Sequence, residues 1–205
     1  MDWDARLPLV AILRGIRPDE ALAHVDALVE AGIEYIEVPT NSPEWQRSVA
    51  LAASHAGKVA LIGAGTVLSS EHVDALVIAG GRLMVTPNTD PQTIRYAAGK
   101  GLVCMAGFAT PSEGFAALAA GAQALKLFPA SIFGPGYVKA LKAVIPKQVP
   151  LFAVGGVTPA NLAEFIAAGC IGAGLGTDLY RPGQSVAQTR NRAAAFVEAF
   201  KRTKQ

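Results

Sequence analysis

The chain has 205 residues, of which 51% are hydrophobic and 17% are charged, and its formal net charge is +2 at pH 7. This composition excludes a disordered chain, and the lack of a basic block argues against nucleic-acid binding. No apolar run approaches the roughly 20 residues that cross a membrane, and the first ten residues do not resemble a signal peptide. Two cysteines lie far apart in apolar runs, which is typical of a reducing compartment, so we expect one cytoplasmic domain over residues 1–205.

Eight short apolar runs alternate with segments of helical character along the whole chain. The runs predict buried strands at residues 9–13, 35–38, 59–64, 82–86, 102–107, 124–128, 151–155 and 173–176. A short helix is expected at residues 2–6. Serine or threonine N-caps, a proline in the first turn and a glycine past the end predict further helices from Pro18 to Gly32, over 69–81, from Thr110 to Gly121, from Thr158 to Gly169 and over about 185–203.

Eight strand–helix units in a chain of this length predict a single (β/α)8 TIM barrel with a short N-terminal helix. An open doubly wound sheet is the alternative fold. Such a sheet usually has fewer strands and a glycine-rich fingerprint after the first one. Here the first strand is followed by LRGIRPDE, which is not that fingerprint. The barrel is therefore the preferred prediction.

In a parallel barrel, functional side chains gather at the carboxyl ends of the strands. Reading those ends in chain order gives Arg14, Glu37, Thr66, Pro87–Asn88, Phe108, Lys126, Gly155–Gly156 and Gly176–Thr177. These residues are scattered in sequence, but the barrel would bring them together. The set combines one lysine, one carboxylate, one arginine and two glycine turns.

Lys126 interrupts an otherwise apolar strand in the segment ALKLFPAS. Because strand side chains alternate, Leu125 and Leu127 would face the helices and Lys126 the barrel interior. Burial disfavours the ammonium form, and a neutral amine can attack a carbonyl to form an imine, which then acts as an electron sink. The alternative is a structural lysine that extends to the rim or pairs with Glu37.

Glu37 lies inside the second strand, between Ile36 and Val38, and should also point into the barrel. Imine chemistry needs several proton transfers, and one carboxyl group near the lysine could perform them. The alternative is a buried salt bridge to Lys126 or Arg14, which would be compatible with catalysis.

Two glycine-rich turns, AVGGVTPAN and AGLGTD, follow the seventh and eighth strands. Barrels of this kind bind phosphate there through backbone N–H groups, and Thr158 and Thr177 could add hydroxyl donors. The alternative is that the glycines only form tight turns. The three histidines fall in predicted helices without ligand spacing, so no metal or other cofactor is expected, and there is no Ser/His/Asp arrangement.

A family resemblance covers nearly the whole chain. It rests on the segments LPLVAILRG, IEVPTNSP, IGAGTV, VTPN, GFATPSE, ALKLFPAS, AVGGVTP and GLGTDLY, in that order. Together they resemble the class I aldolases of the 2-keto-3-deoxy-6-phosphogluconate and 2-keto-3-deoxy-6-phosphogalactonate type. The resemblance implies a TIM barrel, usually a homotrimer, that reversibly cleaves a phosphorylated sugar acid to pyruvate and glyceraldehyde 3-phosphate.

Matched by motif, the family's Schiff-base lysine falls on Lys126 and its acid/base glutamate on Glu37. Its phosphate turns fall on Gly155–Gly156 and Gly176–Thr177, and Thr66 and Pro87 would line the pyruvate half of the site.

Two departures separate this chain from the gluconate branch. Where the gluconate branch typically reads E-V-T-L-R-T, this chain reads E-V-P-T-N-S, so the arginine of that motif is replaced by Asn41. Arg14 is therefore the candidate partner of the substrate carboxylate. The threonine before the glycine pair is Val154, which cannot hydrogen-bond the C4 oxygen. Both departures resemble the galactonate branch.

The sequence therefore predicts a class I aldolase acting on 2-dehydro-3-deoxy-6-phosphogalactonate. The alternatives are the same reaction on the gluconate C4 epimer, a phosphate-binding isomerase or epimerase that uses Glu37 and Lys126 without an imine, and a non-catalytic sugar-phosphate binding protein.

Overall fold

All eight predicted strands form, and they close into one parallel barrel in chain order, with β1 paired to both β2 and β8. The computed structural model describes residue 3 and residues 6–204. The strands are β1 (Leu9–Ile12), β2 (Tyr35–Pro39), β3 (Leu61–Gly65), β4 (Leu83–Val85), β5 (Val103–Phe108), β6 (Ala124–Leu127), β7 (Leu151–Val154) and β8 (Gly172–Leu175). This order confirms the TIM barrel.

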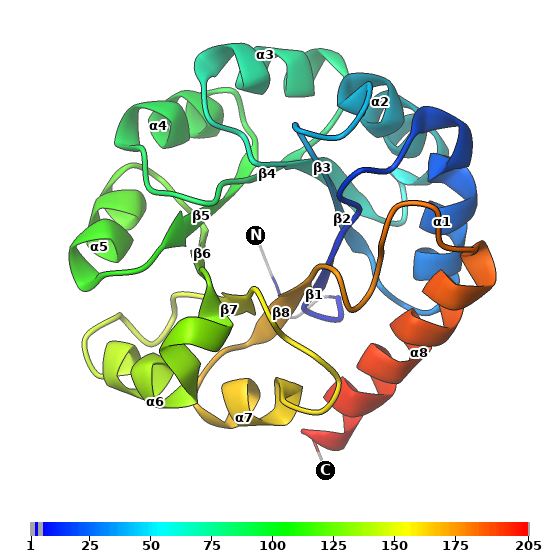
Figure 1. Cartoon of the computed structure of the whole chain (residues 1–205). Helices are drawn as coiled ribbons and strands as arrows, with labels where there is room; N and C mark the ends of the chain where they lie inside the picture. The colour runs from blue at the N-terminus through cyan, green and yellow to red at the C-terminus, as the bar shows by residue number, and fades with distance from the viewer. Residues whose placement is uncertain (1–2, 4–5, 205) are drawn as a thin grey trace.

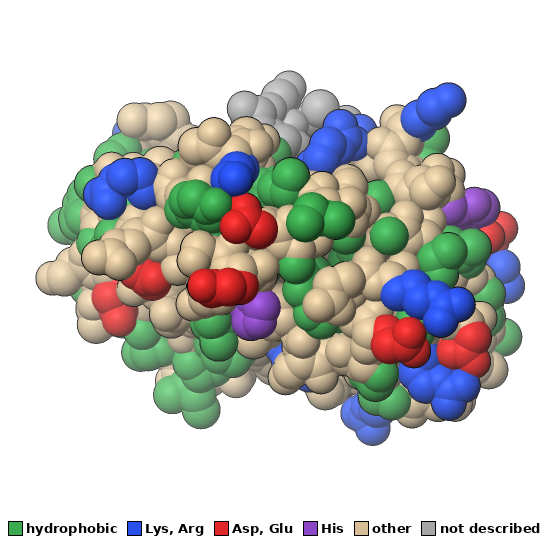
Figure 2. All heavy atoms as spheres, turned by 90° about the horizontal axis from the view of Figure 1, so that it is seen from above, with side chains coloured by type: hydrophobic (Ala, Val, Ile, Leu, Met, Phe, Trp, Pro, Cys, Tyr) green, Lys and Arg blue, Asp and Glu red, His purple; other side chains and the backbone are tan. Residues whose placement is uncertain are grey.

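One helix follows each strand, and the helices form a ring around the barrel (Figure 1). They are α1 (Pro18–Glu30), α2 (Trp45–Ala56), α3 (Ser70–Ile78), α4 (Pro91–Gly99), α5 (Pro111–Ala119), α6 (Ala130–Lys142), α7 (Leu162–Ala167) and α8 (Val186–Arg202). On the wall seen in Figure 2, acidic, basic and hydrophobic side chains mix without a large area of one charge sign. The short helix predicted at 2–6 falls mostly on residues 2, 4 and 5, which lie outside the described residues.

The alternation of strand side chains divides the buried residues into two clusters. Residues such as Leu125 and Leu127 belong to the cluster between the barrel and its helices. Residues such as Val10, Met105 and Phe152 form a second cluster inside the barrel. Because the barrel interior is packed with side chains, a charged group placed there is taken out of water.

The predicted helix caps are correct at α3 and α5 but wrong at α7. The Ser69 hydroxyl accepts from the His72 amide, and Thr110 forms a capping box with Glu113. Thr158 does not cap α7, because residues 158–161 form a turn and the helix begins at Leu162. In that turn the Asn161 amide donates to Thr158 Oγ1 at 3.3 Å and the Thr158 amide to Asn161 Oδ1 at 2.8 Å.

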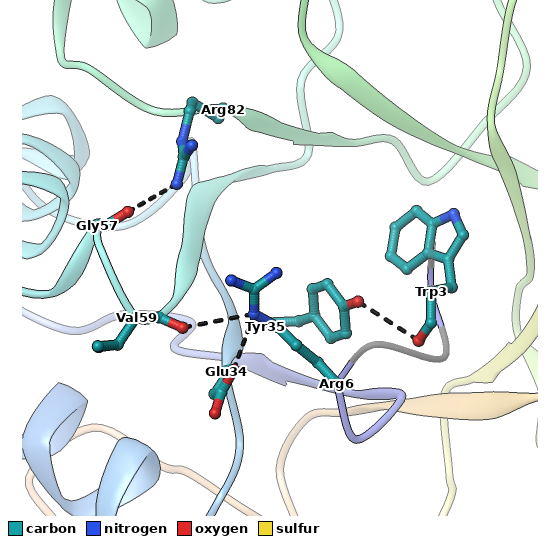
Figure 3. Close-up of polar contacts among 7 residues, drawn as sticks. All are labelled: Trp3, Arg6, Glu34, Tyr35, Gly57, Val59 and Arg82. Atoms are coloured by element: carbon teal, nitrogen blue, oxygen red, sulfur yellow. Dashed lines mark hydrogen bonds and ion pairs between the residues drawn. The ribbon is translucent and has the colours of Figure 1, made fainter. Parts of the chain in front are cut away.

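The amino-terminal end of the barrel is closed by Trp3 (Figure 3). Its ring centroid lies 5.1 Å from that of Tyr35 and 5.2 Å from that of Phe152, and Tyr35 Oη donates to the Trp3 carbonyl at 3.4 Å. Nearby, Arg6 Nε pairs with Glu34 at 2.8 Å. Because aromatic rings fill this end, the barrel is open at its other end, where the strands have their carboxyl ends.

Both cysteines are free and buried, as the sequence predicts. Burial raises the pKa of each thiol to about 12, so both stay protonated and unreactive at neutral pH. In the described part of the chain, no helix combines the length and the apolar character needed to span a membrane.

Candidate active site

A cavity of about 450 Å³ opens at the carboxyl ends of the strands. Eight residues predicted for the site line it, namely Arg14, Pro87, Lys126, Val154, Gly155, Gly156, Gly176 and Thr177. Glu37 and Thr66 do not line the cavity but interact with residues that do, through the electrostatic effect of Glu37 on Lys126 and a hydrogen bond from Arg14 to Thr66. Thr158 lies in the turn before α7, outside the lining. The barrel thus brings together residues from β1, β2, β3, β4, β6, β7 and β8.

Lys126 points into the barrel from β6, as strand alternation predicts. Its side chain is 5% exposed, while its neighbours Leu125 and Leu127 are fully buried in the outer cluster. Burial lowers the pKa of Lys126 from 10.5 to about 8; Glu37 opposes this change, and Arg14 adds to it. Its Nζ lies 5.2 Å from the centroid of the Phe128 ring, at the mouth of the cavity. The neutral amine is therefore accessible at a pH not far above neutrality.

Glu37 points into the same space from β2 and is 1% exposed. Burial raises the pKa of its carboxyl to about 7, although Lys126, Arg14 and the Gly65 amide pull it in the opposite direction. Its Oε2 has no hydrogen-bond partner among the described residues. Gly65 makes room for this carboxylate, because a Cβ atom at that position would overlap with it. An unpartnered buried oxygen next to an amine is suited to exchanging protons with a bound molecule.

The Arg14 guanidinium connects three strand ends. Its Nη1 donates to Asn41 Oδ1 at 2.6 Å and its Nη2 to Thr66 Oγ1 at 3.5 Å. Thr66 has a φ of 57°, a conformation that is strained for a β-branched residue and that is found at functional sites. Asn41 and Thr66 together aim Arg14 at the cavity, where its fork of N–H donors can hold a carboxylate.

The two glycine turns form the opposite wall of the cavity. Gly155 and Gly156 have φ values of 95° and 73°, and a side chain at Gly156 would meet Ser131 at the start of α6. The amides of Gly156 and Thr177 have no protein acceptor among the described residues. Free amides on a glycine turn can bind an anion.

Sequence reasoning missed the segment after β8, where Tyr180, Arg181 and Pro182 also line the cavity. The available signal was positional: RPG, at residues 181–183, lies in the loop between β8 and α8, and loops at this end of a barrel carry function. Phe128, whose ring lies next to the Lys126 amine, also lines the cavity and is not among the predicted site residues. No group of three or more His, Cys, Asp or Glu side chains is arranged to hold a metal ion within the part of the chain that is described.

Comparison with known proteins places the chain in a family. The family model described as KDPG and KHG aldolase matches residues 4–193. The 2-dehydro-3-deoxy-6-phosphogalactonate aldolase of Escherichia coli (strain K12) is 58% identical over 205 residues, which are 100% of both chains. A probable enzyme of the same name from Rhizobium meliloti (strain 1021) is 50% identical over 193 residues, 94% of this chain and 91% of that one. A solved structure described as native KDPGal matches with a TM-score of 0.98 at 58% identity, over 100% of both chains.

Proposed function

Because this chain belongs to the KDPG and KHG aldolase family, we propose that it performs aldol cleavage through an imine at Lys126 and proton transfers at Glu37. The chain is an aldolase, as the sequence predicts. Its substrate is the one for which the two relatives are named, 2-dehydro-3-deoxy-6-phosphogalactonate. We propose that reversible cleavage of this substrate gives pyruvate and glyceraldehyde 3-phosphate. The observation that carries the mechanism is a buried lysine of lowered pKa beside a buried carboxyl of raised pKa.

The reaction begins when the neutral Lys126 amine attacks the C2 ketone. The resulting carbinolamine loses water with a proton supplied by Glu37, and an imine remains. Glu37, now a carboxylate, takes the proton of the C4 hydroxyl. The C3–C4 bond breaks, its electron pair passes into the imine, and glyceraldehyde 3-phosphate leaves. Protonation of the enamine at C3 and hydrolysis then release pyruvate and regenerate the amine.

The remaining predicted residues hold the substrate in this proposal. Arg14 binds the carboxylate through its forked N–H groups, with Thr66 and Pro87 beside the pyruvate half. The amides of Gly155–Gly156 and Gly176–Thr177 bind the phosphate, and the Thr177 hydroxyl can add a donor. Thr158 is the weakest member of the set, because its hydroxyl is engaged by the Asn161 amide.

Borohydride reduction in the presence of pyruvate tests the imine. We expect a pyruvyl adduct on the peptide that carries Lys126, and no adduct after Lys126→Met. Lys139→Met is the matched control, because Lys139 lies exposed on α6 and should leave trapping unchanged. An isomerase or epimerase that used the same pair without an imine would give no adduct in any variant.

The substrate preference depends on Val154, which lines the cavity and offers no hydrogen-bond partner to the C4 oxygen. We expect kcat/KM to favour the galactonate epimer over the gluconate epimer. Val154→Thr supplies a hydroxyl, and one net hydrogen bond of about 1 kcal/mol would move the ratio toward gluconate by about fivefold. A wild-type ratio that favours gluconate would refute the assigned substrate without refuting the aldolase.

We also propose that residues 1–205 act as one domain that assembles into a homotrimer in the cytoplasm. Large hydrophobic side chains on the outer helices support assembly, since Ile78 at the end of α3 is 87% exposed and Ile132 in α6 is 78% exposed. Light scattering coupled to size-exclusion chromatography tests the oligomeric state. A monomer mass at micromolar concentration would refute the trimer.

A further inference from the structure

Arg181 is a cation at the cavity to which the proposed mechanism gives no role. It lies in the β8–α8 loop, residues 176–185, and lines the cavity together with Gly156 and Thr177. Its Nε donates to the Thr177 carbonyl at 2.9 Å. Within the described residues, its two terminal nitrogens have no hydrogen-bond acceptor and no carboxylate within 4.0 Å. Two charged donors are therefore available beside the second glycine turn.

The β8–α8 loop is held in place by a chain of hydrogen bonds that reaches α1. The Arg181 amide donates to Gln184 Oε1 at 3.1 Å, and Gln184 Nε2 donates to Thr189 Oγ1 at 2.7 Å. Thr189 Oγ1 lies 2.8 Å from His24 Nδ1, and both side chains are buried. These hydrogen bonds tie the exposed backbone at Arg181, through the half-buried Gln184, to the buried pair of Thr189 and His24, and they restrain the loop.

The same loop also packs directly on the β1–α1 connection. Pro182 closely approaches Gly15, where an added Cβ atom would lie 2.6 Å from Pro182 Cγ. The loop that carries Arg181 is therefore anchored to both α1 and the β1–α1 connection, and the Arg181 side chain faces the cavity. A side chain carried on such a backbone loses less freedom on binding a ligand than one on a loose loop.

Most charged side chains that line the cavity already have a role in the proposed mechanism or carry the wrong charge for binding phosphate. Arg14 is bonded to Asn41 and faces the carboxylate half, and Lys126 is the amine of the reaction. At the glycine turns the backbone amides carry no net charge, and Asp178, the one carboxylate among the described residues of the lining, opposes an anion. A phosphate dianion at these turns is held more strongly when a charged donor joins the amides, and Arg181 is the described cation on this wall that is free to do so.

We propose that Arg181 is the residue that selects phosphorylated over unphosphorylated substrates, by pairing its two terminal nitrogens with phosphate oxygens. This inference rests on the proposed function, because it places the phosphate at the turns after β7 and β8. Arginine suits the task, since its planar fork matches phosphate geometry and its charge persists at any relevant pH.

The test compares the phosphorylated substrate with the same 2-keto-3-deoxy sugar acid lacking the phosphate. Arg181→Ala should lower kcat/KM for the phosphorylated substrate by about 10- to 100-fold, mainly through KM, and change kcat/KM for the unphosphorylated one less than about twofold. Inorganic phosphate should inhibit the wild type competitively and inhibit Arg181→Ala correspondingly more weakly. Arg181→Lys, which keeps the charge, should restore part of the loss.

Arg190→Ala is the matched control, because Arg190 lies on α8, is half exposed and pairs with Glu30 at 2.8 Å, away from the cavity. It should leave both substrates unaffected. The Arg181→Ala variant should still fold, because the Thr177 carbonyl keeps a hydrogen bond from Arg192 Nη1 at 3.3 Å. Equal losses on both substrates, or no loss on either, would overturn the assignment.

Pyruvate trapping separates this inference from the proposed function, because pyruvate carries no phosphate. A wild-type protein that traps no pyruvate would refute the imine mechanism. If Arg181→Ala traps pyruvate normally and keeps the full preference for the phosphorylated substrate, only the role of Arg181 is refuted.

Discussion

Replacing Lys126 by methionine should stabilise the protein while abolishing imine formation. The pKa of Lys126 falls from 10.5 to about 8 in the fold, and at about 1.4 kcal/mol per pKa unit this burial costs about 3 kcal/mol at pH 7. Methionine has a similar length and no charge to desolvate. Glu37 loses an attractive partner, but burial already raises the pKa of its carboxyl to about 7, so its charged form is only weakly favoured at pH 7 and the added cost is less than about 1 kcal/mol.

The variant should therefore have a free energy of unfolding about 2–3 kcal/mol larger than that of wild type at pH 7, which corresponds to roughly 5–10 °C in Tm for a chain of this size. The gain has a defined pH dependence. Between pH 8 and 10.5 the unfolded chain binds the Lys126 proton and the folded chain does not, so wild-type stability rises with pH across that window. The difference in stability between wild type and variant should have its full size below pH 8 and should disappear near pH 10.5.

Urea unfolding followed by circular dichroism at pH 7 and pH 10, for wild type, Lys126→Met and Lys139→Met, measures these differences. The exposed Lys139 should contribute less than about 0.5 kcal/mol at either pH. A variant that is no more stable than wild type at pH 7, or one that is equally stabilised at both pH values, would show that the ammonium of Lys126 is not the group that is penalised.

Three further changes address the neighbours of Lys126. Glu37→Gln removes the charge that raises the pKa of Lys126, so the midpoint of the pH profile for pyruvate trapping should move to lower pH while turnover falls; an unchanged midpoint would contradict the coupling. Thr66→Gly relieves the strain at φ 57° and should stabilise by up to about 1 kcal/mol in urea unfolding, with a lower kcat/KM because Arg14 loses a partner. Gly65→Ala forces a methyl group into the Glu37 carboxylate and should cost about 1–3 kcal/mol and most of kcat; wild-type activity in a folded variant would refute that packing role.

Strand positions were predictable because burial on both faces leaves a strong signal in sequence. The eight apolar runs differ from the observed strands by at most two residues at either end. Helix boundaries were less predictable. The segment α6 is two helical stretches that meet at a kink, where Gly134 has a non-helical φ of 73° and is followed by Pro135.

The α7 boundary shows how a local pattern can mislead. Thr158 and Pro159 have the order of a cap and a first helical residue, as in Thr110 and Pro111, where the prediction is correct. At 158–161 the Asn161 side chain instead accepts from the Thr158 amide, and this closed turn delays the helix by one turn. A single sequence cannot distinguish two competing local hydrogen bonds of similar strength.

The centre of the site was predictable for the same reason as the strands. A charge at an inward position of a buried strand is expensive, so Lys126 and Glu37 stood out against their apolar neighbours. Arg181 gave no such signal, because an arginine in a loop costs nothing to expose. Its place at the cavity follows from tertiary contacts, namely Pro182 against Gly15 and the hydrogen bonds through Gln184, which no local pattern encodes.

The pKa values of Lys126 and Glu37 have a consequence for the first step of the proposed mechanism. Attack on the ketone needs the amine neutral, and loss of water then needs a proton on the carboxyl. Both conditions are met when the pair holds its single proton on Glu37. The fold lowers the pKa of Lys126 from 10.5 to about 8 and raises the pKa of Glu37 from 4.5 to about 7, so two values that lie far apart in water come close together and this arrangement becomes accessible from the ion pair. Because both arrangements carry the same total charge, the proton can move between the two groups without exchange with solvent. Burial of both groups thus keeps the reactive arrangement populated at neutral pH, where an exposed lysine would be almost entirely charged.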